Sequence, residues 1–285
     1  MLVCSKINKA YGNVLALRDV SISVNSGEII GLIGADGAGK TSLFRIIVTL
    51  LRADNGQVLF DKYDSKKDSN YFRTHLGYMP ERFSLYPDLS IEQNMHFFGE
   101  LFGIDKKLRL ERMEQLYKFS GLKKFASRAA GQLSGGMKQK LALSCILMHE
   151  PKLLVLDEPT TGVDPISRQE FWELLHQIAD NGTGILVSTP YLEEASECDK
   201  INIIHNGKIL ASDNPSSLVS MFKEPLYLIT AEEVITCFEQ IKKTELATQI
   251  QLFGSGIHFI DKKMQGIVGI KKLLKQSKVQ FKNIS

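Results

Sequence analysis

One glycine-rich stretch, from Gly31 to Leu43, constrains the fold of this chain more than any other feature. An apolar run ahead of it predicts a buried strand, and the apolar residues that follow it predict a helix. Between them the sequence fits G-x-x-x-x-G-K-[ST], which in this strand–loop–helix setting is typical of a phosphate-binding loop. Glycines let the backbone pass close to a phosphate chain, and the N–H groups at the start of a helix point toward a bound anion.

The predicted anion site consists of nine consecutive residues: Gly34, Ala35, Asp36, Gly37, Ala38, Gly39, Lys40, Thr41 and Ser42. Lys40 can neutralise terminal phosphates, and the Thr41 hydroxyl can hold Mg²⁺. The alternative is a flexible glycine turn without a ligand. Because four fixed positions match by chance in roughly one chain of this size in a hundred, the sequence favours the phosphate site.

Two adjacent carboxylates are predicted to act on the metal ion and on a water molecule at the phosphate site. The apolar run from Lys152 to Leu156 predicts a strand buried on both faces of a parallel sheet, and Asp157 and Glu158 follow it. Ligands of such sheets bind at the carboxyl ends of the strands, and strand side chains alternate in direction. We therefore expect Asp157 to reach Mg²⁺ through water and Glu158 to orient or deprotonate a water molecule aimed at the γ-phosphate. A solvated acidic turn is the less favoured alternative.

Composition limits the remaining classes of function. The 285 residues are enough for roughly two domains, and a net charge of +3 is too small to indicate nucleic acid as the main partner. The four cysteines are scattered and predict reduced cytosolic thiols. No apolar run approaches the ~18 residues of a membrane span. We expect a soluble, cytoplasmic chain that relies on a partner for any part that crosses a membrane.

The first predicted domain, 1–220, is of the α/β class. It begins with antiparallel strands between Val3 and Val24, and a helical pattern from Leu89 to Phe125 predicts a helical insertion at about 83–150. A helix is expected to start at the cap Ser134, and Asn206-Gly207 predicts a hairpin near the end of the domain. An apolar group just before the insertion is expected either to pack between lobes or to dock another protein: Phe83, Leu85 and Tyr86.

A small second domain, 225–285, is predicted to be a ferredoxin-like α+β appendage with the order βαββαβ. Its expected elements are strand Leu226–Thr230, helix Glu232–Lys242, strands Ala247–Phe253 and Ile257–Ile260, helix Gln265–Lys275 and strand Val279–Phe281. Its lysines indicate a solvated helix face or, less favoured, contact with an acidic surface: Lys262, Lys263, Lys271, Lys272 and Lys275.

The ordered set of motifs resembles the nucleotide-binding subunit of an ABC transporter over about Leu2 to Val219. The set comprises the phosphate loop, the signature Leu-Ser-Gly-Gly-Met at 133–137, the strand ending in Asp157-Glu158, and the turn Thr-Gly-Val-Asp at 161–164. Bacterial exporters of the multidrug or polyketide-antibiotic type are the most similar group. The resemblance implies a P-loop NTPase fold with a RecA-like parallel sheet. It also implies ATP hydrolysis that drives export, and a place on the cytoplasmic face of the membrane beside a membrane-spanning permease subunit.

The resemblance also implies roles for single residues. Two cassettes, as a homodimer or as paired cassettes, would close head to tail over two Mg-ATP. Ser134, Gly135 and Gly136 would then complete the ATP site of the opposite subunit. Tyr11, which on chemistry alone is an ordinary aromatic at a strand end, would stack on adenine, and Asp164 would lie at the dimer seam. The helical insertion would receive a cytoplasmic helix of the permease.

Three positions depart from the usual pattern of that family. Glu81 stands where glutamine is usual; its carboxylate can bind Mg²⁺ but brings negative charge near the triphosphate. Pro190 replaces a histidine that contacts the γ-phosphate, and loss of one such donor commonly costs ~10²–10³ in rate. Asp36 replaces asparagine. Because Glu158 is present, we expect slow hydrolysis rather than none.

Two other functions are alternatives to transport. One is a degenerate cassette that acts as an ATP-dependent regulatory binding module with little turnover. The other, action on ribosomes or DNA, is disfavoured because the chain has one cassette and no sustained heptads. The sequence leaves open that the chain is part of a longer polypeptide with a second cassette.

Overall fold

The computed structural model describes residues 1–285 apart from 83, 222, 245, 247–248, 262–264 and 278. Its internal contacts divide the chain into two units, Met1–Leu218 and Val219–Ser285, which are described separately below. The expectations for Phe83, for the start of the strand at Ala247 and for Lys262 and Lys263 lie outside the described residues.

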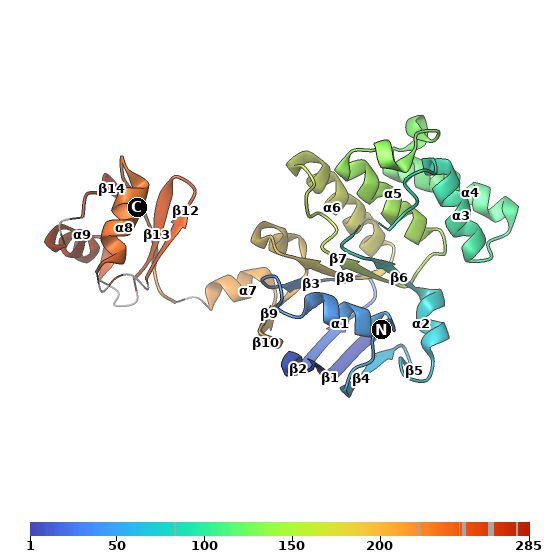
Figure 1. The fold of residues 1–285 in the computed structure, drawn as a ribbon, viewed down its shortest axis with the longest axis horizontal. Coiled ribbons are helices and arrows are strands. Elements are labelled where there is room, and N and C mark those ends of the chain that lie inside the picture. Colours follow the sequence, from blue (N-terminus) through green and yellow to red (C-terminus); the bar gives the residue numbers. More distant parts are fainter. Residues whose placement is uncertain (83, 222, 245, 247–248, 262–264, 278) are drawn as a thin grey trace. The chain divides into compact units, whose positions relative to one another are not determined.

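A six-stranded sheet forms the centre of the first unit, in the order β10-β9-β3-β8-β7-β6 (Figure 1). Its strands are β3 (Ile29–Ile33), β6 (Leu76–Met79), β7 (Leu153–Asp157), β8 (Gly184–Thr189), β9 (Lys200–His205) and β10 (Lys208–Asp213). Only the edge pair β9 and β10 is antiparallel among the pairings of this sheet. Every residue of β3, β7 and β8 is buried, as expected for strands covered on both faces. The predicted parallel core is confirmed.

A second, antiparallel sheet of the first unit has the order β2-β1-β4-β5. It contains β1 (Leu2–Tyr11), β2 (Val14–Val24), β4 (Asn55–Phe60) and β5 (Tyr63–Asp64). Helix α1 (Lys40–Ile47) lies between this sheet and the central one, where Leu43, Phe44 and Ile47 join side chains of both sheets in one apolar core. This packing fixes the start of α1, and with it the phosphate loop, against β3.

Helices cover the face of the central sheet opposite to α1 (Figure 1). They are α3 (Ile91–Leu101), α4 (Lys106–Ser120), α5 (Gly135–Leu147) and α6 (Pro165–Asp180); α2 (Ser69–His75) precedes β6. A side chain caps the start of α3, α4, α5 and α6: Ser90, Asp105, Ser134 and Asp164. The cap predicted at Ser134 is confirmed. Short 3₁₀ helices at Lys123–Phe125 and Ala130–Gln132 join α4 to α5. The range predicted for the helical insertion, about 83–150, contains α3, α4, this connection and α5.

The hairpin predicted at Asn206-Gly207 is confirmed, since β9 and β10 pair directly across it and both residues have positive φ angles, 46° and 74°. A 3₁₀ helix, η3 (Leu192–Glu197), lies between β8 and β9. The short α7 (Pro215–Ser220) follows β10. Within the described ranges, no helix has the length and apolarity needed to cross a bilayer.

The second unit has the order β11 (Leu226–Thr230), α8 (Val234–Lys242), β12 (Ile250–Phe253), β13 (Gly256–Ile260), α9 (Gly266–Gln276) and β14 (Asn283–Ile284). Its antiparallel sheet runs β12-β13-β11-β14, which agrees with the predicted ferredoxin-like arrangement. The last strand was predicted at Val279–Phe281, and this is wrong. The N–H of Val279 bonds the end of α9, and that of Gln280 donates to the side chain of Gln240, so the pairing with β11 starts only at Lys282.

Candidate functional site

The phosphate loop connects β3 to α1, and two of its glycines are required by close backbone approach. A Cβ atom on Gly34 would lie 2.3 Å from the carbonyl oxygen of Ile204. Gly39 has a φ angle of 109°, and a Cβ there would lie 2.5 Å from the carbonyl oxygen of Ala16. The loop is therefore held between β9 and β2, with its backbone at the start of α1.

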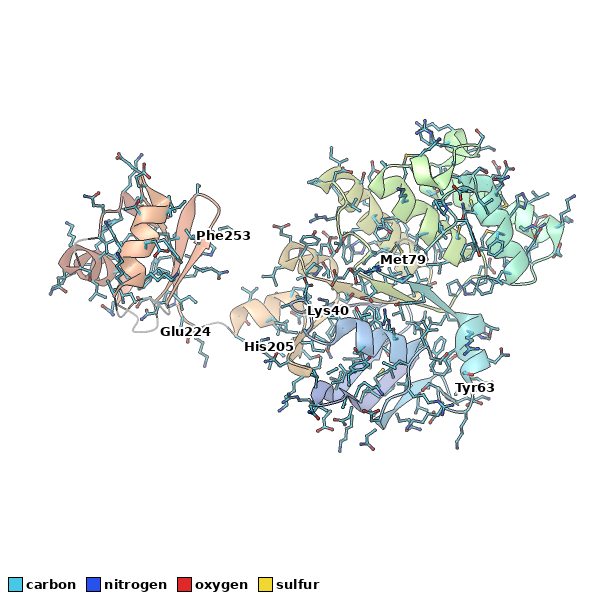
Figure 2. All side chains as sticks on the ribbon, in the orientation of Figure 1. Lys40, Tyr63, Met79, His205, Glu224 and Phe253 are labelled. Carbon is cyan, nitrogen blue, oxygen red and sulfur yellow. The ribbon has the colours of Figure 1, made fainter. Side chains whose placement is uncertain are left out.

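Lys40 is the first residue of α1 and is only 4% exposed (Figure 2). Its ammonium group donates to the carbonyl oxygens of Gly34 at 2.7 Å and Ala35 at 3.3 Å. It also forms an ion pair with the Glu158 carboxylate at 3.0 Å, while the exposed Asp36 carboxylate lies 3.9 Å away. The structure thus brings the predicted cation and the predicted base into direct contact.

Asp157 ends β7, and Glu158 follows with a left-handed φ of 50°. Ser188, on the neighbouring strand β8, orders both residues: its hydroxyl donates to Asp157 Oδ1 at 2.7 Å and accepts from the Glu158 N–H at 3.0 Å. Burial raises the pKa of the Asp157 carboxyl, whereas the bond from the Ser188 hydroxyl acts to lower it. Asp157 Oδ2 is buried without a hydrogen-bond partner among the described residues.

A cavity of about 550 Å³ opens at this end of the central sheet. It is lined by nine residues that the sequence analysis selected: Tyr11, Asp36, Gly37, Gly39, Lys40, Thr41, Ser42, Glu81 and Glu158. Among the selected residues of the loop and of β7, Gly34, Ala35, Ala38 and Asp157 are not in its lining. Gly34 and Ala35 instead contact Lys40 through their carbonyl oxygens, and Asp157 is held under the cavity by Ser188.

Tyr11 is the last residue of β1, Glu81 follows the end of β6, and both line the cavity. The Tyr11 side chain is 47% exposed, and its hydroxyl lies 3.3 Å from the Ser42 hydroxyl. An exposed aromatic ring at the mouth of an anion site is available for stacking on a base. Glu81 adds a carboxylate to the same wall.

The signature residues Ser134, Gly135 and Gly136 are not in the lining of this cavity. Ser134 caps α5 by accepting a hydrogen bond from the N–H of Met137 at 3.3 Å. Gly136 packs against the start of α6, where an added Cβ would lie 2.4 Å from the Cβ of Ser167. Their role in the site of an opposite subunit stays a prediction.

Two residues of the site, Ser188 and Ala16, were not predicted from the sequence, and Thr161 was predicted only as part of the turn at 161–164 and not as a residue of this cavity. The signal for Ser188 was its place at the carboxyl end of the strand next to β7, where it is in register with Asp157. Thr161 lines the cavity and its hydroxyl lies 3.3 Å from Glu158 Oε2. No sequence pattern around Ala16 indicates a place in the site, because only the fold brings its carbonyl oxygen close to Gly39.

Comparison with known proteins identifies the family. The family model described as "ABC transporter" matches residues 17–161. The probable multidrug ABC transporter ATP-binding protein YbhF of Escherichia coli (strain K12) is 41% identical over 218 residues, which cover 76% of this chain and 38% of that protein. The linearmycin resistance ATP-binding protein LnrL of Bacillus subtilis (strain 168) is 33% identical over 221 residues, covering 77% of this chain and 71% of that one.

Solved structures give the same result. An ATP-binding subunit of an ABC transporter superimposes with a TM-score of 0.70 at 29% identity, covering 78% of this chain and 93% of the other. A bacterial ABC transporter cassette solved as a dimer shares the fold, with a TM-score of 0.68 at 23% identity over 75% of this chain and 98% of the other. The chain spans well under half the length of YbhF. It belongs to the ABC transporter family, and its first unit is the ATP-binding cassette of that family.

Proposed function

We propose that this chain binds Mg-ATP in the 550 Å³ cavity and hydrolyses it to drive export through a membrane-spanning permease subunit. The observation that carries the proposal is the contact between the buried Lys40 and Glu158 beneath a glycine loop at the start of a helix. A buried ammonium group beside free helix N–H groups favours a phosphate chain. A carboxylate at the same point supplies a base or an orienting group for water.

The residues present fit Mg²⁺. Oxygen atoms are the ligands that Mg²⁺ prefers; Thr41 and Glu81 supply them in the cavity lining, and Asp157 supplies one at the end of β7. The unpartnered Oδ2 of the buried Asp157 is the observation that supports a cation there. When bound, Mg²⁺ neutralises charge on the β- and γ-phosphates. Asp157 would act through water, held in place by Ser188.

The remaining residues of the loop and its surroundings would bind and orient the nucleotide. Backbone N–H groups from Gly34 to Ser42 enclose the phosphates, Lys40 neutralises them, and Tyr11 stacks on adenine. Hydrolysis is expected to be slow because Pro190 has neither a side-chain nor a backbone donor for the developing anion. In the cavity lining no histidine replaces it among the described residues.

A second cassette, identical or paired, would complete the site. Ser134 caps α5, and the signature residues Ser134 to Gly136 do not line the cavity beside their own phosphate loop. This placement suits a partner cassette bound head to tail. The names of YbhF and LnrL support export of drug-like compounds, with this chain peripheral on the cytoplasmic face of the membrane. We assign the cassette to 1–220, with a helical subdomain at about 83–150 that receives a permease helix, and a small separate domain to 225–285.

The test is the ATPase rate of the chain and of Glu158→Gln. We expect the variant to bind Mg-ATP but to lose at least about a hundredfold in turnover, because the amide cannot accept a proton. The matched control is Glu170→Gln on α6, whose carboxylate pairs with Lys140 outside the cavity. Equal rates for the parent and Glu158→Gln would reject hydrolysis here and leave ATP-dependent regulation of a partner.

A further inference from the structure

The loop from Glu158 to Asp164 joins β7 to α6 and carries the proposed base. Glu158 and Thr161 line the phosphate cavity, and the Thr161 hydroxyl lies 3.3 Å from Glu158 Oε2. Thr160, which lies between them in the sequence, is only 1% exposed and is not in the cavity lining. The position of the base therefore depends on the contacts that hold Thr160 inside the protein.

Glu194, on η3, holds Thr160 by a side-chain hydrogen bond. The Thr160 hydroxyl donates to Glu194 Oε1 at 2.6 Å, and Glu194 is only 3% exposed. A hydrogen bond to a buried carboxylate is stronger than one between neutral groups in water. Thr160 is two residues from Glu158, and the N–H of Thr161 bonds the Glu158 carbonyl oxygen at 3.2 Å. A displacement of Thr160 would therefore displace the base as well.

Arg168, on α6, contacts both Glu194 and the far end of the same loop. Its Nε lies 3.6 Å from Glu194 Oε1, and its Nη2 donates to the Val163 carbonyl oxygen at 3.5 Å. Its guanidinium group also lies over the Tyr191 ring, 4.1 Å from the ring centroid. Tyr191 directly follows Pro190. The loop, the first turn of α6 and the segment after β8 are thus connected through Glu194 and Arg168.

The surroundings of Glu194 indicate more than a contribution to stability. Burying a carboxylate is costly unless the charge is closely paired, and the Arg168 guanidinium lies beyond hydrogen-bonding distance, at 3.6 Å. Glu194 Oε2 is also buried and has no hydrogen-bond partner anywhere in the described ranges. An apolar side chain of similar volume would be less costly to bury. What the carboxylate adds is a fixed acceptor for the Thr160 hydroxyl.

We propose that Glu194 is a positioning residue for ATP hydrolysis, which acts through Thr160 to hold the loop where Glu158 lines the phosphate cavity. The inference rests on the proposed function, because it takes Glu158 as the base. Glu194 does not line that cavity, so it is not expected to touch the nucleotide. Loss of the link should lower turnover at unchanged ATP affinity, because a small misplacement of a reacting group costs up to about a hundredfold in rate.

The experiment compares kcat and the Kd for Mg-ATP in the full chain, in Thr160→Val and in Thr160→Ser. Valine keeps the branched shape and removes the donor, whereas serine keeps the donor. We expect Thr160→Val to lose at least about tenfold in kcat at a Kd within about twofold of the parent, and Thr160→Ser to keep most of the rate.

The matched control is Thr183→Val, which removes a hydroxyl that donates to the Pro151 carbonyl oxygen outside the cavity and should keep the parental kcat. Three results would overturn the proposal. They are an unchanged kcat in Thr160→Val, an equal loss in Thr160→Ser or in the control, and a loss of ATP affinity that accompanies the loss of rate.

Glu194→Gln tests the carboxylate itself. The amide still offers an oxygen to Thr160 but loses the charge beside Arg168, so kcat should fall at least about threefold at unchanged Kd. In the Thr160→Val background the same change should have little further effect, because both changes act on one link. Losses that multiply would overturn the route through Thr160. A parental kcat in Glu194→Gln would also overturn the proposal, including where Thr160→Val does not fold.

Glu158→Gln separates this inference from the proposed function. If that variant is as fast as the parent, hydrolysis is rejected and the inference with it; if it is slow while Thr160→Val is not, only the positioning role is rejected. Hydrogen exchange tests the link without nucleotide. The amides of Thr161 and Val163, which bond within the loop, should exchange at least about tenfold faster in Thr160→Val, and unchanged exchange would reject the link.

Discussion

Ser188 is predicted to be the residue that orders both carboxylates of the ATP site, and Ser188→Ala tests this. The substitution removes the hydrogen bond from the Ser188 hydroxyl to Asp157 Oδ1 at 2.7 Å. It also removes one of the two acceptors of the Glu158 N–H, which keeps its bond to the Ser188 carbonyl oxygen at 3.2 Å. Hydrogen bonds to charged groups contribute about 1.5–3 kcal/mol. Because Asp157 Oδ2 already lacks a partner, both oxygens would then be unpaired, and we expect a loss of about 2 kcal/mol in the free energy of unfolding near neutral pH.

The expected loss depends on pH, and its sign follows from the direction of the Asp157 pKa shift. Burial raises the pKa of Asp157 in the folded chain above its value in the unfolded chain. Between these two pKa values the folded chain binds more protons than the unfolded chain, so stability falls as the pH rises. The Ser188 bond opposes that shift, and its removal raises the folded pKa further. We therefore expect a larger loss in Ser188→Ala at pH 7 than at pH 4, because a hydrogen bond to the ionised carboxylate contributes more than one to the neutral acid.

Urea unfolding at the two pH values measures this difference. The single tryptophan, Trp172, is buried in the first unit, so its fluorescence reports that unit alone. The control is Ser144→Ala, which removes an equally buried hydroxyl that donates to a backbone carbonyl inside α5 and should give a loss independent of pH. A Ser188→Ala loss that is the same at both pH values would refute the reasoning.

Three further changes test the nucleotide site. Lys40→Ala should weaken Mg-ATP binding at least about tenfold in calorimetry, because it removes the buried phosphate partner; parental affinity would contradict the site. Tyr11→Ala should weaken ATP about five- to a hundredfold while Tyr11→Phe does not, since base stacking contributes ~1–3 kcal/mol. Pro190→His should raise the ATPase rate at least about tenfold at unchanged ATP affinity, and an unchanged rate would show that Pro190 does not limit turnover.

Local sequence predicted the parts of the site that depend on contiguous residues. The loop from Gly34 to Thr41 was predictable because strand, glycine turn and helix follow one another directly. The caps at Ser134 and Asp164 and the hairpin at Asn206-Gly207 were predictable for the same reason, since each requires particular residue types within three positions.

Contacts between distant segments could not be predicted in this way. The left-handed φ of Glu158 depends on Ser188 from another strand, and no pattern around Glu158 shows it. The last strand was misplaced because Val279 reads as a strand residue, whereas its N–H is used to end α9. The orphaned oxygen of Glu194 likewise exists only because the fold buries η3 against α6.

The contacts of Lys40 also indicate how phosphate binding and the base would be coupled. An ammonium group has three donors, and Lys40 has three close oxygen partners: the carbonyls of Gly34 and Ala35 and the Glu158 carboxylate. A phosphate must replace one of them. The two carbonyls are fixed by the loop, but the Glu158 side chain can rotate. Phosphate binding is therefore expected to release Glu158, so that the carboxylate becomes available to water only when its target is bound.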